Sequence, residues 1–340
     1  MAKYVAICLA ANNAAYDAEL FARIGQNYDH HYEALSAWQA DQATIGADVT
    51  VYGGLNVECY NDWPGVGLDD RVSIVDWITT EGIPITVGCP QGQGWDGIID
   101  SGFFMHMSDN TFNGSAISLS NGIYGIIYNL QVTSNPAQNR TSFGLIIGDE
   151  GTAYRCIVID IDDKIKTGIR ADRNSYIIGC VVFGCHQSSF GLQNYKYSYI
   201  YNCIAINSYK YGFEKGSGGS VTFYNCVSYG AAVTDWVVPN SVGSNNASGD
   251  YAGNPPPGTD PYPVNIVAAD FEADGYHLSA QGIINLNVAG INKTGEIPGF
   301  TLDIDFDQRP PVDPWSIGAD QAVGSSATPK PNPLFFGQDF

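Results

Sequence analysis

The middle of the chain alternates short runs of apolar residues with turns rich in glycine, asparagine and serine. Between residues 143 and 230 four segments align, each with a glycine-centred triplet followed by a strand-like run that contains one cysteine. The triplets are Phe143-Gly144-Leu145, Thr167-Gly168-Ile169, Phe190-Gly191-Leu192 and Tyr211-Gly212-Phe213, and the cysteines are Cys156, Cys180, Cys203 and Cys226. The cysteines recur after 24, 23 and 23 residues, and Leu130 stands at the same place in an earlier copy. A period of this length, with several short strands and no helical stretch, predicts a solenoid of β coils.

Stacked coils place equivalent residues in columns along the solenoid axis, because neighbouring parallel strands lie about 4.8 Å apart. We expect the four cysteines to form one buried, reduced column, since free cysteine is a small and usually buried apolar residue. Disulfides between adjacent coils, and redox or metal chemistry, are the alternatives. A second column holds Tyr154, Tyr201 and Tyr224, with Ile178 in the remaining place, and predicts aromatic packing on a strand face.

The flanking regions predict a cap and a closing segment around these coils. Residues 3–9 read as a first strand, and residues 32–42 as a short capping helix with Leu35, Trp38 and Gln42 on one stripe. Strand-like pieces follow at 50–52, 72–78 and 83–87, and the repeat ends after residue 230. The predicted divisions are 1–97 for the N-terminal strands and capping helix, 98–238 for the coils, 239–263 for a loop, 264–326 for a C-terminal β closure and 327–340 for an extended tail.

Further motifs run over most of the chain. They are the stretch 32–42 before Glu58-Cys59-Tyr60-Asn61-Asp62, the Asn/Gly-Cys coils, the loop 245–250, Phe271 with Gly275-Tyr276-His277-Leu278, and the ending from Asp303-Ile304-Asp305 through Arg309-Pro310 to Trp315–Asp320. Together they resemble the pectate-lyase-like superfamily, and more narrowly repetitive virion and surface proteins of phages and bacteria. The resemblance implies an all-β fold: a right-handed single-stranded parallel β-helix with an N-terminal cap and an irregular C-terminal closure. It implies no particular activity, because this group shares no catalytic motif.

Charge and composition narrow the function classes. Thirty-five Asp and Glu residues against fifteen Lys and Arg give a formal net charge of −20, which argues against nucleic acid as a partner because such binding depends on basic residues. The apolar run 4–11 is much shorter than the roughly 20 residues of a transmembrane helix, and it imitates a signal peptide only weakly. We therefore expect synthesis in a cytoplasm, no membrane insertion, and free thiols in the eight cysteines.

One acidic run could carry chemistry on a polysaccharide. A glycosidase needs two carboxyl groups roughly 5–10 Å apart, and a lyase needs an acidic calcium cluster with a basic residue that takes a proton. Asp160, Asp162 and Asp163 with Arg170 are the residues that could meet either need, with Asp149 one coil earlier. The alternative is a solvated turn of mixed charge, which predicts that these aspartates can be replaced by asparagine without loss of function.

A second acidic set has the 1-3-5 spacing of a calcium loop. Its members are Asp303, Asp305 and Asp307. Gln308 and Pro314 stand where such a loop carries its glycine and its glutamate, and a strand would also place three alternate residues on one face. Calcium is thus a candidate ligand, against a structural closure in which Arg309 pairs with an aspartate. No other cofactor is expected.

The last residues combine prolines with large apolar side chains. The prolines are Pro329, Pro331 and Pro333, and the apolar residues are Leu334, Phe335, Phe336 and Phe340. Alternating prolines hold a segment extended, and exposed apolar patches usually mark contacts. We expect this tail to dock on a neighbouring subunit or a partner protein; the alternative is that it folds back over the last coil.

These features favour a non-enzymatic structural or adhesive protein of a phage virion surface, such as a capsid decoration protein or a spike. We expect a homo-oligomer, with a trimer as the working assumption, and virion proteins as partners; a cell-surface glycan is a further candidate. The alternative function is a polysaccharide lyase or glycoside hydrolase on the same scaffold. The alternative location is outside the cell, as a secreted or cell-surface protein.

Overall fold

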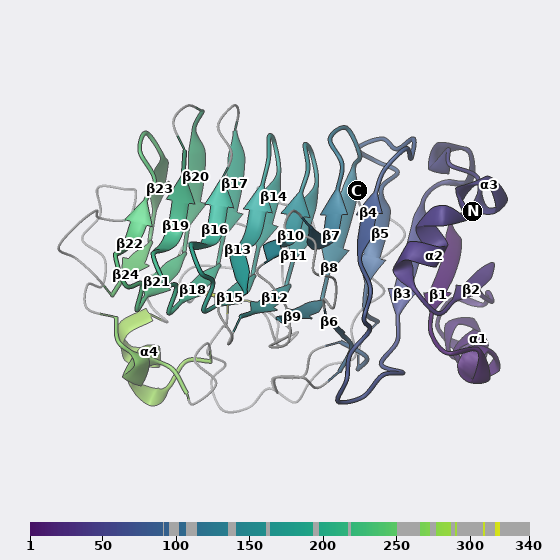
Figure 1. Cartoon of the computed structure of the whole chain (residues 1–340), viewed down its shortest axis with the longest axis horizontal. Helices are drawn as coiled ribbons and strands as arrows, with labels where there is room; N and C mark the ends of the chain where they lie inside the picture. Colours follow the sequence, from purple (N-terminus) through teal and green to yellow (C-terminus); the bar gives the residue numbers. More distant parts are fainter. Residues whose placement is uncertain are drawn as a thin grey trace.

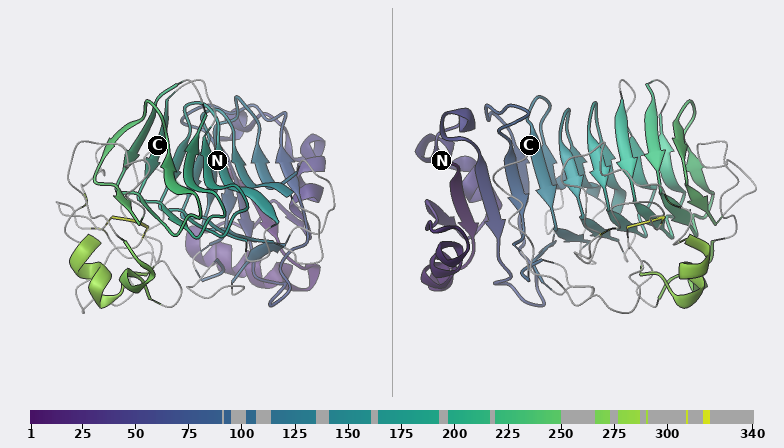
Figure 2. Two further views of the ribbon diagram at one scale, coloured as in Figure 1. Left: turned by 60° about the vertical axis from the view of Figure 1, so that its left-hand side comes forward. Right: turned by 180° about the vertical axis from the view of Figure 1, so that it is seen from behind.

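The computed structural model describes residues 1–90, 92–94, 102–106, 114–134, 141–160, 164–192, 197–216, 219–249, 266–272, 277–286, 290, 309 and 317–319. Its main body is a stack of parallel strands that forms three long sheets (Figures 1 and 2). The chain visits the sheets in the same order in every coil. The protein is therefore an all-β parallel β-helix, as the repeat predicted.

Each of seven coils contributes one strand to each sheet, in the order sheet 1, sheet 2, sheet 3. Sheet 1 contains β4 (Val72–Ile74), β7 (Ser115–Leu119), β10 (Thr141–Ile147), β13 (Ile165–Ala171), β16 (Ser188–Leu192), β19 (Tyr211–Lys215) and β22 (Thr234–Val237). Sheet 2 contains β2 (His30–Tyr32), β1 (Lys3–Ile7) and β3 (Leu55–Cys59), then β5 (Ile85–Gly88), β8 (Gly125–Tyr128), β11 (Thr152–Tyr154), β14 (Tyr176–Ile178), β17 (Ser198–Tyr201), β20 (Val221–Tyr224) and β23 (Val242–Ser244). Sheet 3 contains β6 (Phe104–His106), β9 (Gln131–Thr133), β12 (Ile157–Ile159), β15 (Val181–Phe183), β18 (Ile204–Ile206), β21 (Val227–Tyr229) and β24 (Ala247–Ser248).

The corner between sheets 2 and 3 explains the Asn/Gly-Cys pattern of the repeat. The residue that follows each strand of sheet 2 from β8 onward has a left-handed backbone, with φ between 51° and 60°. These residues are Asn129, Arg155, Gly179, Asn202, Asn225 and Asn245. Glycine and asparagine adopt this conformation at the lowest cost, and the bend turns the following residue into the core. In four successive coils that residue is a cysteine.

Strand pairing corrects the predicted alignment of one copy. Thr167 pairs with Ser188 and Ile169 with Phe190, so the triplet 190–192 is displaced by two residues from the position that the repeat assigned to it. Phe190 points into the core and stacks on Phe213, with ring centroids 4.8 Å apart. Burial of two large aromatic rings decides this register, because they contribute more to the core than a match of glycines does.

The N-terminal end of the core is capped as predicted, although by two short helices. They are α2 (Leu35–Ala40) and α3 (Gln42–Ile45). Leu35 and Trp38 are fully buried against the first strands of sheet 2, and Trp38 stacks on Trp77 with centroids 5.5 Å apart. The strand expected at 50–52 is instead the 3₁₀ helix η2 (Val49–Tyr52), because the Asp48 carboxylate caps the Thr50 N–H and starts a helical turn.

A helix that the sequence pattern did not predict covers the outer face of sheet 2 at its N-terminal end. Helix α1 (Asn13–Ile24) follows the short η1 (Ala10–Asn12), and its Leu20 packs on residues of β1. Two carboxylates hold the start of this segment: Asp62 accepts the Leu9 N–H at 2.7 Å and Glu33 accepts the Ala10 N–H at 3.0 Å. The segment before α1 is therefore held by residues that follow β2 and β3.

The coils continue beyond residue 238, where the sequence indicated a loop. Strands β23 and β24 complete one more coil, which ends at Ser248. Asn246 takes the place of the cysteine there, and its amide accepts the Cys226 N–H at 3.0 Å and donates to the Phe223 carbonyl at 3.0 Å. A polar side chain that satisfies both backbone groups replaces the buried thiol, which is why the cysteine period ends one coil before the solenoid does.

Described segments of the C-terminal region lie along the outer face of sheet 3 (Figure 2). They include η3 (Ala268–Asp270) and α4 (Ala280–Leu286). Phe271 stacks on Tyr229 of β21 with centroids 4.8 Å apart. Gly318 donates its N–H to the Asn225 carbonyl at 2.7 Å and accepts from the Asn202 side chain at 3.1 Å. The closure is thus a lateral cover of one sheet.

Candidate functional site

The acidic candidates for polysaccharide chemistry lie at different corners of the coil. Asp160 follows β12 at the corner between sheets 3 and 1, whereas Arg170 is close to the far end of β13. Strand geometry puts roughly 16 Å between the start of that strand and Arg170. Asp149 lies at the corner between sheets 1 and 2, and Asp162 and Asp163 fall outside the described residues. The described candidates therefore do not converge on one reaction centre.

Asp160 is a buried turn cap. Its side chain is 2% exposed, and its two carboxylate oxygens accept the backbone N–H groups of Lys164 at 2.8 Å and Ile165 at 2.6 Å. Both donors belong to the turn that leads into β13. The carboxylate supplies the acceptors that the sheet ladder does not provide at this corner. Because both of its oxygens accept a backbone N–H and it is buried, it is poorly placed to act on a substrate.

The corner between sheets 1 and 2 carries two ion pairs, one within a coil and one between adjacent coils. Arg170 contacts the Asp172 carboxylate at 3.2 Å, and Arg173 contacts that of Asp149 at 2.9 Å. Asp149 also accepts the Arg173 N–H at 3.1 Å. Burial raises the pKa of Asp172, and the neighbouring Arg170 only partly offsets this effect. The two aspartates thus have different environments, but each is bound by an arginine of the same corner.

The calcium and tail candidates fall outside the described residues. They are Asp303, Asp305 and Asp307, and Leu334, Phe335, Phe336 and Phe340. Arg309 is described and fully buried, and its guanidinium donates to the carbonyls of Gly318 at 3.3 Å and Ala319 at 2.6 Å. Within the part of the chain that the structure describes, no three His, Cys, Asp or Glu side chains gather as metal ligands.

The four repeat cysteines lie at the same place in successive coils, fully buried and as free thiols. Each thiol reaches back to a sheet 2 carbonyl: that of Cys156 donates to Ile127 at 3.4 Å, and that of Cys203 to Ile177 at 3.6 Å. The Cys156 N–H in turn donates to the sulfur of Cys180 at 3.4 Å. Burial raises the pKa of the Cys156, Cys180 and Cys203 thiols, which keeps them protonated. Their role in the described structure is packing.

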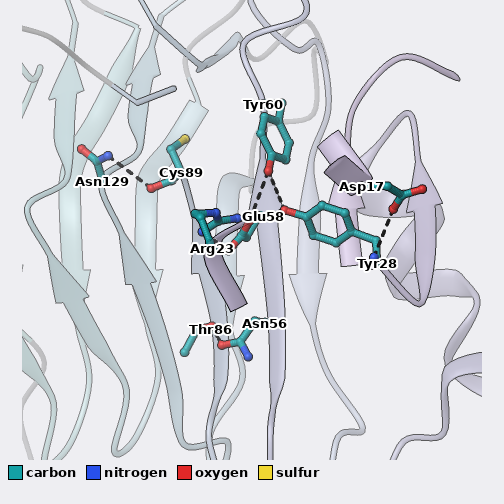
Figure 3. A network of polar contacts seen from close by, with 9 residues as sticks. All are labelled: Asp17, Arg23, Tyr28, Asn56, Glu58, Tyr60, Thr86, Cys89 and Asn129. Atoms are coloured by element: carbon teal, nitrogen blue, oxygen red, sulfur yellow. Dashed lines mark hydrogen bonds and ion pairs between the residues drawn. The ribbon is translucent and has the colours of Figure 1, made fainter. Parts of the chain in front are cut away.

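A buried ionic network lies beneath α1 at the N-terminal end of sheet 2 (Figure 3). We call its members, Glu19, Arg23, Tyr28, Glu58 and Tyr60, the Glu58 cluster. Arg23 binds both carboxylate oxygens of Glu58, one of them at 3.1 Å. The Tyr28 hydroxyl also binds Glu58, and it lies 2.6 Å from the Tyr60 hydroxyl. Helix α1 and strand β3 are therefore joined through a single carboxylate.

Electrostatics separate the two carboxyl groups of this cluster. Glu58 is 3% exposed and paired with Arg23, whose side chain is 33% exposed. Burial raises the pKa of Glu19, an effect that Arg23 and a hydrogen bond from Tyr60 reduce. Burial and the Glu58 charge also raise the pKa of Tyr28 and of Tyr60, so both phenols remain hydrogen-bond donors at neutral pH. The arrangement fastens α1 to β3 and brings the carboxyl groups of Glu19 and Glu58 into one cluster.

Two rows of side chains continue from this cluster along the outer face of sheet 2. We call the row nearer the corner with sheet 1 the first row: Ile126, Thr152, Tyr176, Tyr199, Thr222 and Val242. The second row is Tyr128, Tyr154, Ile178, Tyr201, Tyr224 and Ser244. Tyr176 stacks on Tyr199 with centroids 5.0 Å apart, and Tyr201 on Tyr224 at 5.6 Å. The second row is the tyrosine column that the repeat predicted.

Sequence reasoning missed the Glu58 cluster, although two signals for it were present. Tyr16, Leu20 and Ile24 recur every fourth residue before Gly25, which is the pattern of an amphipathic helix with a glycine stop. Arg23 is one of only fifteen basic residues in the chain, so its place on that helix indicates a buried acidic partner. The partner itself could not be identified, because the pairing of α1 with β3 depends on tertiary structure.

Comparisons with known proteins identify no relative of this chain. The chain matches no family model, no curated protein and no solved structure. None of the helices in the described ranges has the length and apolar character needed to cross a membrane.

Proposed function

We propose that the protein is a non-enzymatic structural or adhesive component of a phage virion surface, and that it acts as a homo-oligomer. The observation that supports this most is the way its carboxylates are used. Asp160 caps a turn, Asp149 binds a neighbouring coil and Glu58 fastens a helix. A solenoid in which these three carboxylates bind groups of their own chain suits a particle component better than an enzyme.

The outer face of sheet 2 supports an adhesive role. It carries four partly exposed tyrosines, a residue type enriched in protein interfaces: Tyr154, Tyr176, Tyr199 and Tyr224. Tyr201, between them in the second row, is buried. The surrounding net charge of −20 keeps copies apart except where uncharged surfaces meet. Stacked coils make such a surface long and flat, as a particle component needs.

Particle association tests the proposal. An antibody against the recombinant protein is used to probe purified phage particles from an infected culture, with quantitative mass spectrometry for copy number. We expect the protein in fixed stoichiometry with the major capsid or tail protein, in copies that are a multiple of three. Its absence from particles at all stages of assembly would contradict the proposal.

The Glu58 cluster favours one second candidate, a glycoside hydrolase. A retaining or inverting glycosidase uses one protonated and one ionised carboxyl group. Two carboxyl groups lie in this cluster: Glu19, whose pKa is raised by burial, and Glu58, which binds Arg23. The tyrosine rows begin beside them. The 3% exposure of Glu58 is the reason we rank this second.

Polysaccharide turnover separates the two candidates. Reducing ends and unsaturated products are measured on a panel of acidic and neutral polysaccharides with wild type, Glu19→Gln and Asp160→Asn. We expect no release by any of them. Release by wild type that is abolished in Glu19→Gln but retained in Asp160→Asn would establish the hydrolase and refute the non-enzymatic function.

A further inference from the structure

The first row of sheet 2 is an uncharged stripe on a strongly acidic molecule. None of its six side chains is ionisable at neutral pH, and they lie on six consecutive strands from β8 to β23. Tyr176 and Tyr199 form the ridge of the stripe, and the shorter Thr152 and Thr222 flank them. Each tyrosine thus has a smaller neighbour on the side away from its stacking partner. Val242, at the end of the stripe, is 53% exposed.

The tail has the chemistry that such a stripe binds. Extended segments with repeated prolines dock on surfaces lined by aromatic side chains, because the extended form loses little entropy on binding. Residues 327–340 carry prolines at every second position from 329 to 333, then Leu334, Phe335 and Phe336. Lys330 and Asp339 are the only charged residues of the tail, so it brings no net charge to the acidic body. Lys330 is also a cation suited to tyrosine ring faces.

Length and position agree with this pairing. Five strand spacings separate β8 from β23, about 24 Å, and the eight residues 329–336 span about 25 Å when extended as polyproline II. The last described residues of the chain bind Asn202 and Asn225, which directly follow β17 and β20. Ten residues from Ala319 to Pro329 reach up to about 33 Å. This is enough to cross the width of sheet 2, roughly 10–13 Å.

We propose that residues 327–340 dock along the first row of sheet 2, with the prolines on Tyr176 and Tyr199 and the phenylalanines beyond them. The occupant is the tail of the same chain, because the described chain ends beside Asn202 and Asn225 and the intervening residues are long enough to reach the row. The proposal does not depend on the virion role, because it rests on the surface and the tail alone.

Hydroxyl-radical footprinting of the full chain tests the contact. Oxidation of Tyr176 and Tyr199 is compared between wild type and Phe335→Ser/Phe336→Ser, with Tyr209, which is 58% exposed, as the internal reference. We expect several-fold faster oxidation of the two row tyrosines in the variant, with Tyr209 unchanged. Addition of excess synthetic peptide 327–340 should restore their protection, and a scrambled peptide should not. Equal oxidation in wild type and variant would overturn the proposal.

A binding measurement keeps the test independent of a folding defect. Fluorescent peptide 327–340 is titrated into the full-length tail variant, alone and combined with Tyr176→Ser/Tyr199→Ser or with Tyr209→Ser. Loss of two aromatic contacts should weaken binding about tenfold, whereas Tyr209→Ser should leave it unchanged. Circular dichroism confirms that each variant is folded. Absence of peptide binding, or equal binding to the row variant, would refute the docking site.

Discussion

Single polar residues complete the backbone hydrogen bonding of this solenoid where its strands stop. The buried Asp235 carboxylate accepts the Ala231 N–H at 3.3 Å, in addition to the hydroxyls of Ser228 at 3.0 Å and Ser248 at 2.9 Å. Asp160 and Asn246 likewise accept backbone N–H groups at other corners. The strand ladder satisfies backbone groups only along the sheets, so each corner needs its own acceptors and donors. An acidic residue in such a chain is therefore explained first by a hydrogen bond at a corner, and only then by catalysis.

Replacement of Asp160 should lower stability and leave function intact. Asp160→Ala removes the acceptor of two buried N–H groups, and hydrogen bonds to a charged group contribute about 1.5–3 kcal/mol each. We expect a loss of about 2–4 kcal/mol in the free energy of unfolding, and a smaller loss for Asp160→Asn. Urea unfolding measures both, with the exposed Glu81→Ala as a control that should stay within about 0.5 kcal/mol of wild type. An unaltered midpoint for Asp160→Ala would show that the turn does not need this cap.

The cysteine column predicts slow thiol chemistry. A thiolate is the reactive form, and burial raises the pKa of Cys156, Cys180 and Cys203. Labelling with a thiol reagent at pH 8 should therefore be negligible in the native protein over hours and complete within minutes in guanidinium. Rapid native labelling of these three residues, or disulfides between them in the purified protein, would contradict the packing role.

At the scale of whole elements, α1 depends on the Glu58 cluster for its position. Only Leu20 of this helix is fully buried, so the ionic contact carries much of its attachment. Arg23→Ala leaves Glu58 buried without its cation, which for a partly exposed pair should cost about 2–3 kcal/mol. We expect α1 to become sensitive to limited proteolysis while the coils remain resistant. Arg23→Met/Glu58→Met, which removes both charges, should recover most of the loss.

The pH dependence of stability should contain a contribution from Glu19. Its pKa is higher in the folded protein than its usual 4.5, so the folded state binds more protons than the unfolded state over the interval between the two values. The free energy of unfolding therefore falls as pH rises through that interval. Glu19→Gln should flatten this part of the curve, whereas Glu81→Gln should leave it unchanged. A curve for Glu19→Gln that superimposes on wild type would show that Glu19 titrates normally.

The elements differed in how far the sequence could predict them. A period of 23 or 24 residues with cysteine after Asn or Gly was sufficient for the coils, because every coil repeats the same corner. The register of Phe190 was not predictable, since a shift of two residues keeps the alternation of faces and only core packing decides it. The place of helix α1 and of the closure on sheet 3 could not be predicted, because both depend on contacts between residues that are far apart in the sequence. For the acidic run at 160 the sequence offers a turn and polysaccharide chemistry as alternatives, and its described member, Asp160, serves a turn.

On the scale of the molecule, the three outer faces of the solenoid differ in what covers them. C-terminal segments pack on sheet 3, and α1 covers the first strands of sheet 2. The remaining strands of sheet 2 present the tyrosine rows, while sheet 1 carries charged side chains such as Lys166 and Glu214. Arg155 lies over the Tyr154 ring of the second row, whereas the six residues of the first row carry no charge at neutral pH. The first row is therefore the surface that we propose for contacts.

The last prediction concerns a chain that ends at Ser326. The described core clusters contain no residue beyond Ala319, so we expect this shortened chain to keep the circular dichroism and unfolding midpoint of the full protein. If the tail joins subunits or attaches the protein to a particle, light scattering should show loss of the oligomer, and pull-down should show loss of particle binding. A full-length Gln338→Ala variant is the matched control, because Gln338 has no part in the proposed contact, and it should retain both. Normal assembly and particle binding by the shortened chain would show that the tail has no part in attachment, and the tyrosine rows would then have to act without it.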